Sequence, residues 1–257
     1  MSVALATKAY KGGWGMRQVL RTRPWVLLRE PQRFVDFFHR EGKLKEIPKG
    51  GSFLTHGSIN GQTALLLEGL VSFDFVDNAG RQRTFALILP NRMLGDLDVL
   101  NPVRPNVVVE VLQPSKFLVV DNHVFRRYLR ESVETMELYA DLSILKEEGI
   151  LEGAFANFSM DLDSRLRALF LSILQSEKVE PDAEGWMTSP ITLSVTDITR
   201  IVSASRAWVS TTLSDWCETG LMKKEVHTMA FREAVFEGLR DWMADSKNVR
   251  PTSIHVE

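Results

Sequence analysis

LSVTDITRIVSASRAWVSTTLSDWCETGLM, residues 193–222, is the stretch that decides how the chain is interpreted. Ser194 and Asp197 have the spacing of a capping box, which can begin a helix. After a break at Ser203, Ser205 is an N-cap candidate for a second helix, which Gly220 can end. Two short helices joined by a tight turn are typical of a helical hairpin in a globular core. They are also typical of a helix-turn-helix, which places its second helix in the DNA major groove.

Apolar residues at helical spacing support these two helices. The expected buried faces are Ile198, Ile201 and Val202 in the first helix and Val209, Leu213 and Trp216 in the second. Residues 223–232 predict a hairpin behind them, the wing, with Met229 and Phe231 facing inward. Cys217, beside Trp216, is expected to be a packed structural thiol, with redox sensing as the alternative.

Composition sets the class of protein. The chain has 257 residues, of which 44% are hydrophobic and 25% charged, as expected for one or two globular domains. It has no run of eighteen apolar residues and no signal-peptide pattern, so we expect no membrane span and no membrane partner. The scarcity of cysteine indicates a cytoplasmic location. A single cysteine excludes an internal disulfide and a multi-cysteine metal cluster. The formal net charge of −2 permits nucleic-acid binding only through a local basic patch.

Upstream, short apolar runs alternate with glycine or proline turns and predict a sandwich or small barrel of strands. The expected strands are 52–55, 64–67, 71–76, 84–89, 107–112 and 116–120. A short helix over residues 31–40 precedes them, and a basic arm that contains Trp14 and Trp25 comes first.

A long helical segment follows at residues 125–157 and can pack on the barrel or pair with its copy in a dimer. Its expected apolar stripe contains Val133, Met136, Ala140, Ile150 and Ala154. Its expected acidic outer face contains Glu131, Glu134, Glu137, Asp141, Glu147, Glu148 and Glu152. Gly149 and Gly153 indicate either a bend or a close approach of two backbones.

Residues 158–161 interrupt this helix as a hinge, and another helix is expected at 162–175. The predicted organisation is an arm at 1–30, a β-roll at 31–124, a dimerisation helix and hinge at 125–160, a winged helix-turn-helix at 161–240 and a tail at 241–257.

This order resembles the cyclic-AMP receptor and fumarate-nitrate regulator (CRP/FNR) superfamily of bacterial transcription factors. The resemblance covers roughly residues 44–239. It rests on IPKGGSFLTHGS and LLLEGLVSFDFVDNAGRQRTFALILPNRMLGDLDVL in the barrel, LDSRLRALFLSIL in the first DNA-domain helix and the opening stretch quoted above. It implies an α+β fold with a jelly-roll-like β-roll of the cyclic-nucleotide-binding type. It also implies a homodimeric regulator, not an enzyme, whose partners are palindromic double-stranded DNA, its own copy and RNA polymerase.

The resemblance maps DNA contacts onto the second helix of the helix-turn-helix. The mapped residues are Ser205, Arg206, Trp208, Ser210, Thr211 and Thr212, with Lys223, Lys224 and Arg232 in the wing and Arg200 in the first helix. Arg206 is the expected base reader, because a guanidinium can bond guanine O6 and N7 together. Many members have Glu where Ala207 stands and Arg where Thr211 stands. The target half-site is therefore expected to differ from the family's common one.

The effector is not predicted by the sequence. Gly95 and Asp96 stand at the Gly-Glu position of the family's phosphate cassette, with Arg104 as the phosphate arginine, but Pro105 has no N–H to donate. By the resemblance, Ile150 and Leu151 occupy the positions that hydrogen-bond adenine in family members that bind cyclic AMP, and both are apolar. They could line a pocket for a lipid-like or aromatic ligand, or they could fill the pocket. We therefore expect no ligand or an unidentified one, and no cofactor or metal.

Two other functions are compatible with parts of the sequence. A metal-dependent enzyme of the cupin type needs clustered histidines, whereas His39, His56, His123, His227 and His255 are scattered. The other is a cyclic-nucleotide-type sensor module that acts through protein partners, with weak or no DNA binding.

Overall fold

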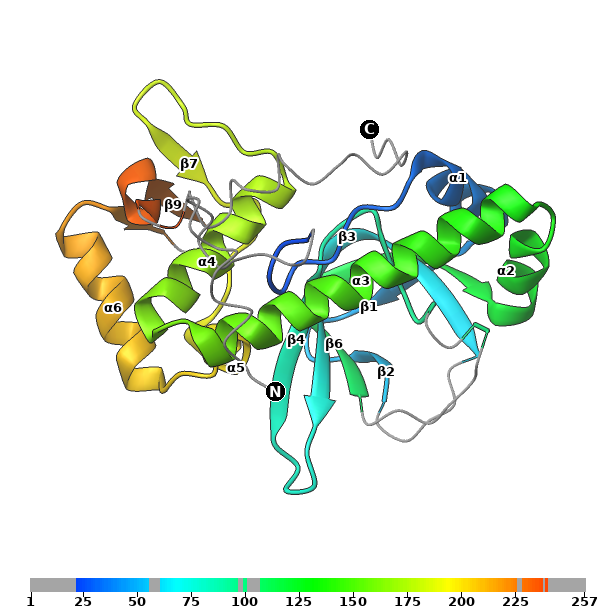
Figure 1. The fold of residues 1–257 in the computed structure, drawn as a ribbon, viewed down its shortest axis with the longest axis horizontal. Helices are drawn as coiled ribbons and strands as arrows, with labels where there is room; N and C mark the ends of the chain where they lie inside the picture. Colours follow the sequence, from blue (N-terminus) through cyan, green and yellow to red (C-terminus); the bar gives the residue numbers. More distant parts are fainter. Residues whose placement is uncertain are drawn as a thin grey trace, which may run out of the picture.

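The computed structural model describes residues 22–55, 61–96, 99–100, 107–225, 228–237 and 239. Trp14, His56, Arg104, Pro105, His227 and the predicted tail at 241–257 lie outside this part. Within it, an N-terminal sheet and a C-terminal helical unit lie at opposite ends of one long helix, α3, which runs across both (Figure 1). The fold is α+β, as predicted.

The N-terminal unit is a six-stranded antiparallel sheet, the β-roll, with strand order β1-β6-β3-β4 and with β2 paired to β6 and β5 to β3. The strands are β1 Lys43–Ile47, β2 Ser52–Leu54, β3 Gln62–Val76, β4 Gln82–Ile88, β5 Arg92–Leu94 and β6 Val107–Asp121. Alternate apolar side chains, among them Leu66, Val111 and Phe117, fill its interior.

Two of these strands are longer than the sequence predicts. β3 and β6 each continue where a turn was expected, at Gly69 and at Gln113-Pro114. The register shifts between Leu66 and Val71 absorb both residues in bulges. Gly69 has φ +100°, and a Cβ there would lie 2.6 Å from the Pro114 carbonyl oxygen. The glycine and the proline therefore bend a continuous strand pair, as bulges do.

The helical segment predicted at 125–157 is two helices, α2 Asn122–Leu129 and α3 Val133–Ser159. Ser132 divides them, because its side chain accepts a hydrogen bond from Thr135 N and caps α3. Phe125 of α2 packs against Phe34, Phe37 and Phe38 of α1 Gln32–Glu41.

The apolar stripe predicted on α3 is confirmed only in part, because Val133 and Ala140 are exposed. Met136 and Ile150 pack on the N-terminal unit. Glu152, predicted on the outer face, is 4% exposed. The large apolar side chains that α3 exposes are Val133, Ile144, Leu151, Phe155 and Phe158. Helix α3 has one apolar face that packs on the N-terminal unit and a second that is exposed, and the spacing of hydrophobic residues alone does not show which residue belongs to which face.

The segment before α1, residues 22–31, is part of the core. Trp25 is 1% exposed, and its carbonyl oxygen accepts a hydrogen bond from Leu87 N of β4. Its indole lies against Gly153 of α3, where a Cβ would be 2.6 Å from Trp25 Cδ1. Gly149 and Gly153 therefore admit another segment of the same chain, one of the two roles predicted for them.

The C-terminal unit consists of three helices and a three-stranded sheet of order β7-β9-β8. Its elements are α4 Leu162–Ser176, β7 Trp186–Thr188, α5 Val195–Val202, α6 Arg206–Glu218, β8 Met222–Lys224, β9 Met229–Arg232 and the 3-10 turn η2 Glu233–Phe236. One hydrophobic cluster joins this unit to Trp25, Val26 and Leu87, so the N- and C-terminal units share a core. No helix in the described part of the chain is long and apolar enough to cross a membrane.

We predict that Gly153→Val lowers the free energy of unfolding by about 2 kcal/mol, because the added side chain overpacks the rigid, buried indole of Trp25. Urea denaturation checks this. The matched control is Gly61→Val, since a Cβ at Gly61 meets nothing within 4 Å. Equal stability of the two variants would contradict the close contact between α3 and Trp25.

Candidate nucleic-acid interface

Two capped helices form the helix-turn-helix at the predicted residues. Ser194 Oγ accepts a hydrogen bond from Asp197 N, and Asp197 accepts one from Ser194 N in return, which completes the capping box before α5. Ser203 has φ 53° and ψ 44°, a left-handed conformation that turns the chain sharply. Ser205 Oγ then accepts from Trp208 N at 3.2 Å and begins α6.

The inner face of α6 is held by packing. Val209, Leu213 and Trp216 are buried as predicted, and Trp216 makes an edge contact with Phe170 of α4. Gly220, with φ +71°, follows the end of α6. Cys217 was predicted to be packed, but it is exposed, because it is rotated away from the buried stripe by one position along the helix.

The outer face of α6 carries most of the predicted DNA contacts. Ser205, Arg206, Ser210 and Thr211 are exposed, and Trp208 and Thr212 are half-buried. The first turn has no acidic residue. Within the described residues Arg206 has no ion-pair partner. The positive end of the helix dipole adds to its charge, and this combination favours an anion at the start of α6.

The wing adds further cations. Lys223 Nζ and the Arg232 guanidinium lie 4.2 and 4.3 Å from the ring centre of Trp186. Lys223 Nζ is 3.7 Å from Glu184, and both of these side chains are mostly exposed. Lys224 is exposed beside them. The stacked indole therefore positions two charged groups without neutralising them.

Arg200 is differently placed. Its guanidinium Nη1 donates hydrogen bonds to Gln82 and to Glu110 of the β-roll, both at 2.8 Å. Helix α5 contacts β4, and Arg83 Nη1 donates to Ser203 Oγ at 3.0 Å. A phosphate contact by Arg200 stays a prediction, and it would require the guanidinium to leave these partners.

Beneath Arg200 lies a buried carboxylate. Asp74 is fully buried, and its oxygens accept hydrogen bonds from Thr84 Oγ1 at 2.5 Å and Ser72 Oγ at 2.7 Å. Burial raises the pKa of Asp74, while these hydroxyls and the charge of Arg200, 4.0 Å away, act in the opposite direction. Arg200 therefore has a structural role at the contact between α5 and the β-roll.

Of the predicted effector residues, the structure describes Gly95, Asp96, Ile150 and Leu151. Asp96 is buried and pairs with Lys146 Nζ of α3 at 2.7 Å, and Lys146 also pairs with Glu30 at 2.7 Å. Gly95 precedes Asp96 with φ +74°. Ile150 packs on the core of the β-roll, whereas Leu151 is 49% exposed. Asp96 is thus held by a cation of the protein itself.

Sequence reasoning missed this triad of Glu30, Lys146 and Asp96. Burial alone would lower the pKa of Lys146, but the charges of Asp96 and Glu30 raise it above its ordinary value, so Lys146 stays protonated. Tyr139 OH donates to the Asp96 carbonyl oxygen, and burial raises the pKa of Tyr139 to about 12. The only sequence signal was a lysine within an otherwise acidic helix.

Across the described ranges, no group of three or more His, Cys, Asp or Glu side chains could hold a metal ion. No family model matches the sequence. No curated protein matches it either.

Solved structures do match. FixK2 from Bradyrhizobium japonicum has a TM-score of 0.64 and 15% identity, covering 75% of this chain and 93% of FixK2. CLP from Xanthomonas campestris, a c-di-GMP-responsive global regulator, has a TM-score of 0.60 and 12% identity, covering 78% and 99%. A CRP/FNR-family transcriptional regulator from Thermus thermophilus has a TM-score of 0.58 and 15% identity, covering 79% and 98%.

The chain has the CRP/FNR fold. The match includes the β-roll, the long helix α3 and the C-terminal helices with their small sheet, as the sequence resemblance implied. In this fold the helix-turn-helix of α5 and α6 is the candidate nucleic-acid interface.

We predict that Arg200→Gln lowers the free energy of unfolding by about 2 kcal/mol, because buried Asp74 and Glu110 lose their cation. Arg206→Gln, the matched control on the exposed face of the next helix, should change it by less than about 0.5 kcal/mol. Urea denaturation at pH 7 compares the two. An equal effect would show that Arg200 is not held by the β-roll.

Proposed function

We propose that the protein is a divergent CRP/FNR regulator of transcription that binds specific DNA sites as a homodimer. The observation that carries the proposal is the outer face of α6. Arg206 lies at its exposed, capped start, in a fold shared with the regulators compared above.

In this proposal α6 enters the major groove and Arg206 bonds the O6 and N7 atoms of one guanine in each half-site. The hydroxyls of Ser205, Ser210 and Thr211 face the same groove. Thr212 and Trp208, which are half-buried, line its edge. Lys223 and Lys224 approach phosphates from the wing, which fixes the orientation of the reading helix.

Arg200 joins this interface only if α5 leaves β4. Its bonds to Gln82 and Glu110 would have to be exchanged for a phosphate. The arrangement described here therefore supports DNA contacts by α6 and the wing first.

The exposed face of α3 supports a dimer. Ile144, Leu151 and Phe158 recur every seven residues, with Phe155 beside them. Phe158 is 87% exposed. An apolar row of this kind on one helix is the sequence pattern of a coiled-coil seam. A two-fold axis along α3 would present two copies of α6 to a palindromic site.

We infer that the regulator does not use the family's cyclic-nucleotide cassette. Asp96, at the position of the ribose-binding carboxylate, is buried in an ion pair with Lys146. A ligand that needed Asp96 would have to break this pair, which is costly for buried charges. Contact with RNA polymerase stays a prediction.

We predict that Arg206→Ala weakens binding to the protein's preferred genomic fragment by at least tenfold. The dimer loses one bidentate base contact in each half-site, so the two losses together cost at least about 2 kcal/mol, and 1.4 kcal/mol corresponds to tenfold. Quantitative gel shifts at a fixed low salt concentration measure the change, because affinity depends steeply on salt.

The matched control is Arg130→Ala, an exposed arginine after α2 at the opposite end of the molecule (Figure 1). It should bind within twofold of the unmodified protein. If no genomic fragment binds even at low salt, the sensor module that acts through protein partners becomes the better description.

We predict that the double variant Leu151→Glu/Phe158→Glu is monomeric, because four charges would face each other across the seam of the dimer. Sedimentation velocity measures the change in mass. The control Leu44→Glu places a charge on the equally exposed β1 and should remain dimeric. A dimeric double variant would place the interface elsewhere.

A further inference from the structure

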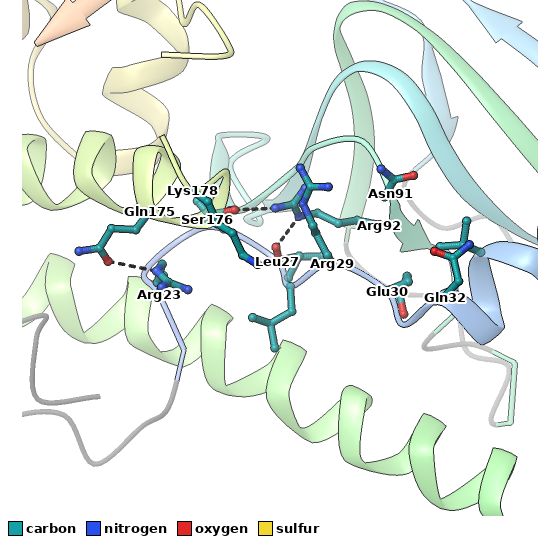
Figure 2. Close-up of a pocket in the computed structure, with 13 residues that line it drawn as sticks. Arg23, Leu27, Arg29, Glu30, Gln32, Asn91, Arg92, Gln175, Ser176 and Lys178 are labelled. Carbon is teal, nitrogen blue, oxygen red and sulfur yellow. Dashed lines mark hydrogen bonds between the residues drawn. The ribbon is translucent and has the colours of Figure 1, made fainter. Parts of the chain in front are cut away.

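A cavity of about 370 Å³ lies where three separate parts of the chain meet. Its walls are the segment 22–31 with the first turn of α1, the start of β5 at Asn91 and Arg92, and the C-terminal end of α4 with Lys178 after it (Figure 2). This volume is typical of sites for small molecules. The cavity lies apart from α6 and from the exposed face of α3.

The lining is strongly cationic. Among the described residues that line the cavity, Arg23, Arg29, Arg92 and Lys178 are cations and Glu30 is a carboxylate. Glu30 is already bound to Lys146 at 2.7 Å. The cavity wall therefore carries an excess of positive charge.

Two of these cations are satisfied within the protein. Buried Arg92 donates to the carbonyl oxygens of Leu27 and Pro90 and to Ser176 Oγ, and it pairs with Glu177 at 2.6 Å. Arg29 pairs with the other oxygen of the same carboxylate. One carboxylate thus serves two guanidinium groups.

The other two cations have no such counter-ion. Arg23 Nε donates to the neutral amide oxygen of Gln175 at 3.1 Å, and no described carboxylate lies within ion-pair distance of Arg23. Burial lowers the pKa of Arg23. Lys178 is exposed and likewise has no ion pair within the described ranges. A partly buried guanidinium without a carboxylate is costly, and a bound anion would remove that cost.

We propose that this cavity binds a small organic anion, with a phosphate or carboxylate group held by Arg23 and Lys178. The lining also contains Val26, Leu28 and Val35, which offer an apolar wall for the body of the ligand. Arginine is suited to this role because its planar fork matches both kinds of anionic group.

The ligand would contact the β-roll side and α4 of the C-terminal unit at once. A ligand bound in the cavity would therefore stabilise the contact between the N-terminal and C-terminal units. The binding step itself does not depend on the proposed function, because the experiment contains no DNA.

Isothermal titration calorimetry of the full chain, at low ionic strength and pH 7.5, tests the proposal. The test anions are inorganic phosphate, pyrophosphate, citrate and octanoate, so that phosphate and carboxylate groups are compared directly. We expect saturable binding of at least one anion with one site per chain.

The variants Arg23→Gln and Lys178→Gln should each weaken that binding, the former at least tenfold. Arg130→Gln removes one positive charge at an exposed position away from the cavity and should leave the affinity within twofold. Lys178 is exposed, so Lys178→Gln tests the site even if Arg23→Gln fails to fold. No saturable binding of any test anion, or equal affinities in Lys178→Gln and Arg130→Gln, would overturn the proposal.

Discussion

The burial of Trp25 is the contact on which the arrangement of the whole chain depends. Its carbonyl oxygen is bonded to β4, its indole lies on Gly153 of α3, and its side chain belongs to the same apolar cluster as α4, α5 and α6. Three parts of the fold are therefore fixed by one residue. Removing a fully buried tryptophan typically costs about 3–5 kcal/mol, a large share of the stability of an ordinary domain.

Ion pairs at the same junction determine how the two units fit. Arg92 and Arg29 bind Glu177 beside the segment 22–31, and Arg200 of α5 binds Glu110 of β6. Burial alone would raise the pKa of Glu177, but the two guanidinium groups lower it, so this carboxylate remains ionised at neutral pH. The pair of Arg92 and Glu177 is buried, and a buried pair adds little net stability although breaking it is costly. The ion pairs at this junction therefore disfavour alternative positions of the C-terminal unit relative to the β-roll.

Local signals explain which parts of the fold could be predicted. The capping box at Ser194 and the N-cap at Ser205 are chemical signals within a few residues, and both helices of the helix-turn-helix begin where they indicate. The bulged strands β3 and β6 were divided incorrectly, since Gly69 and Pro114 are turn residues whose bulge forms only when the two strands pair.

Contacts between residues far apart in the sequence could not be predicted from local patterns. Glu30, Asp96 and Lys146 come from three distant segments, and no local pattern links them. The same applies to Arg200, whose partners are supplied by β4 and β6. Residues 22–30 fall within the predicted arm at 1–30, because a short irregular segment gives no periodic signal of burial. The exposed outer face of α6 was predictable because it follows from one helix and its caps.

These contacts together hold the buried side of α6 against the core and leave its other side, and the apolar row on α3, directed outward. We propose that two such copies bind one DNA duplex. Selection of bound sequences from a random DNA library tests this most directly. We predict an enriched motif with two-fold symmetry, its half-sites centred about 10 base pairs apart or at a multiple of that spacing. An enriched motif without symmetry, or no enrichment, would contradict the account.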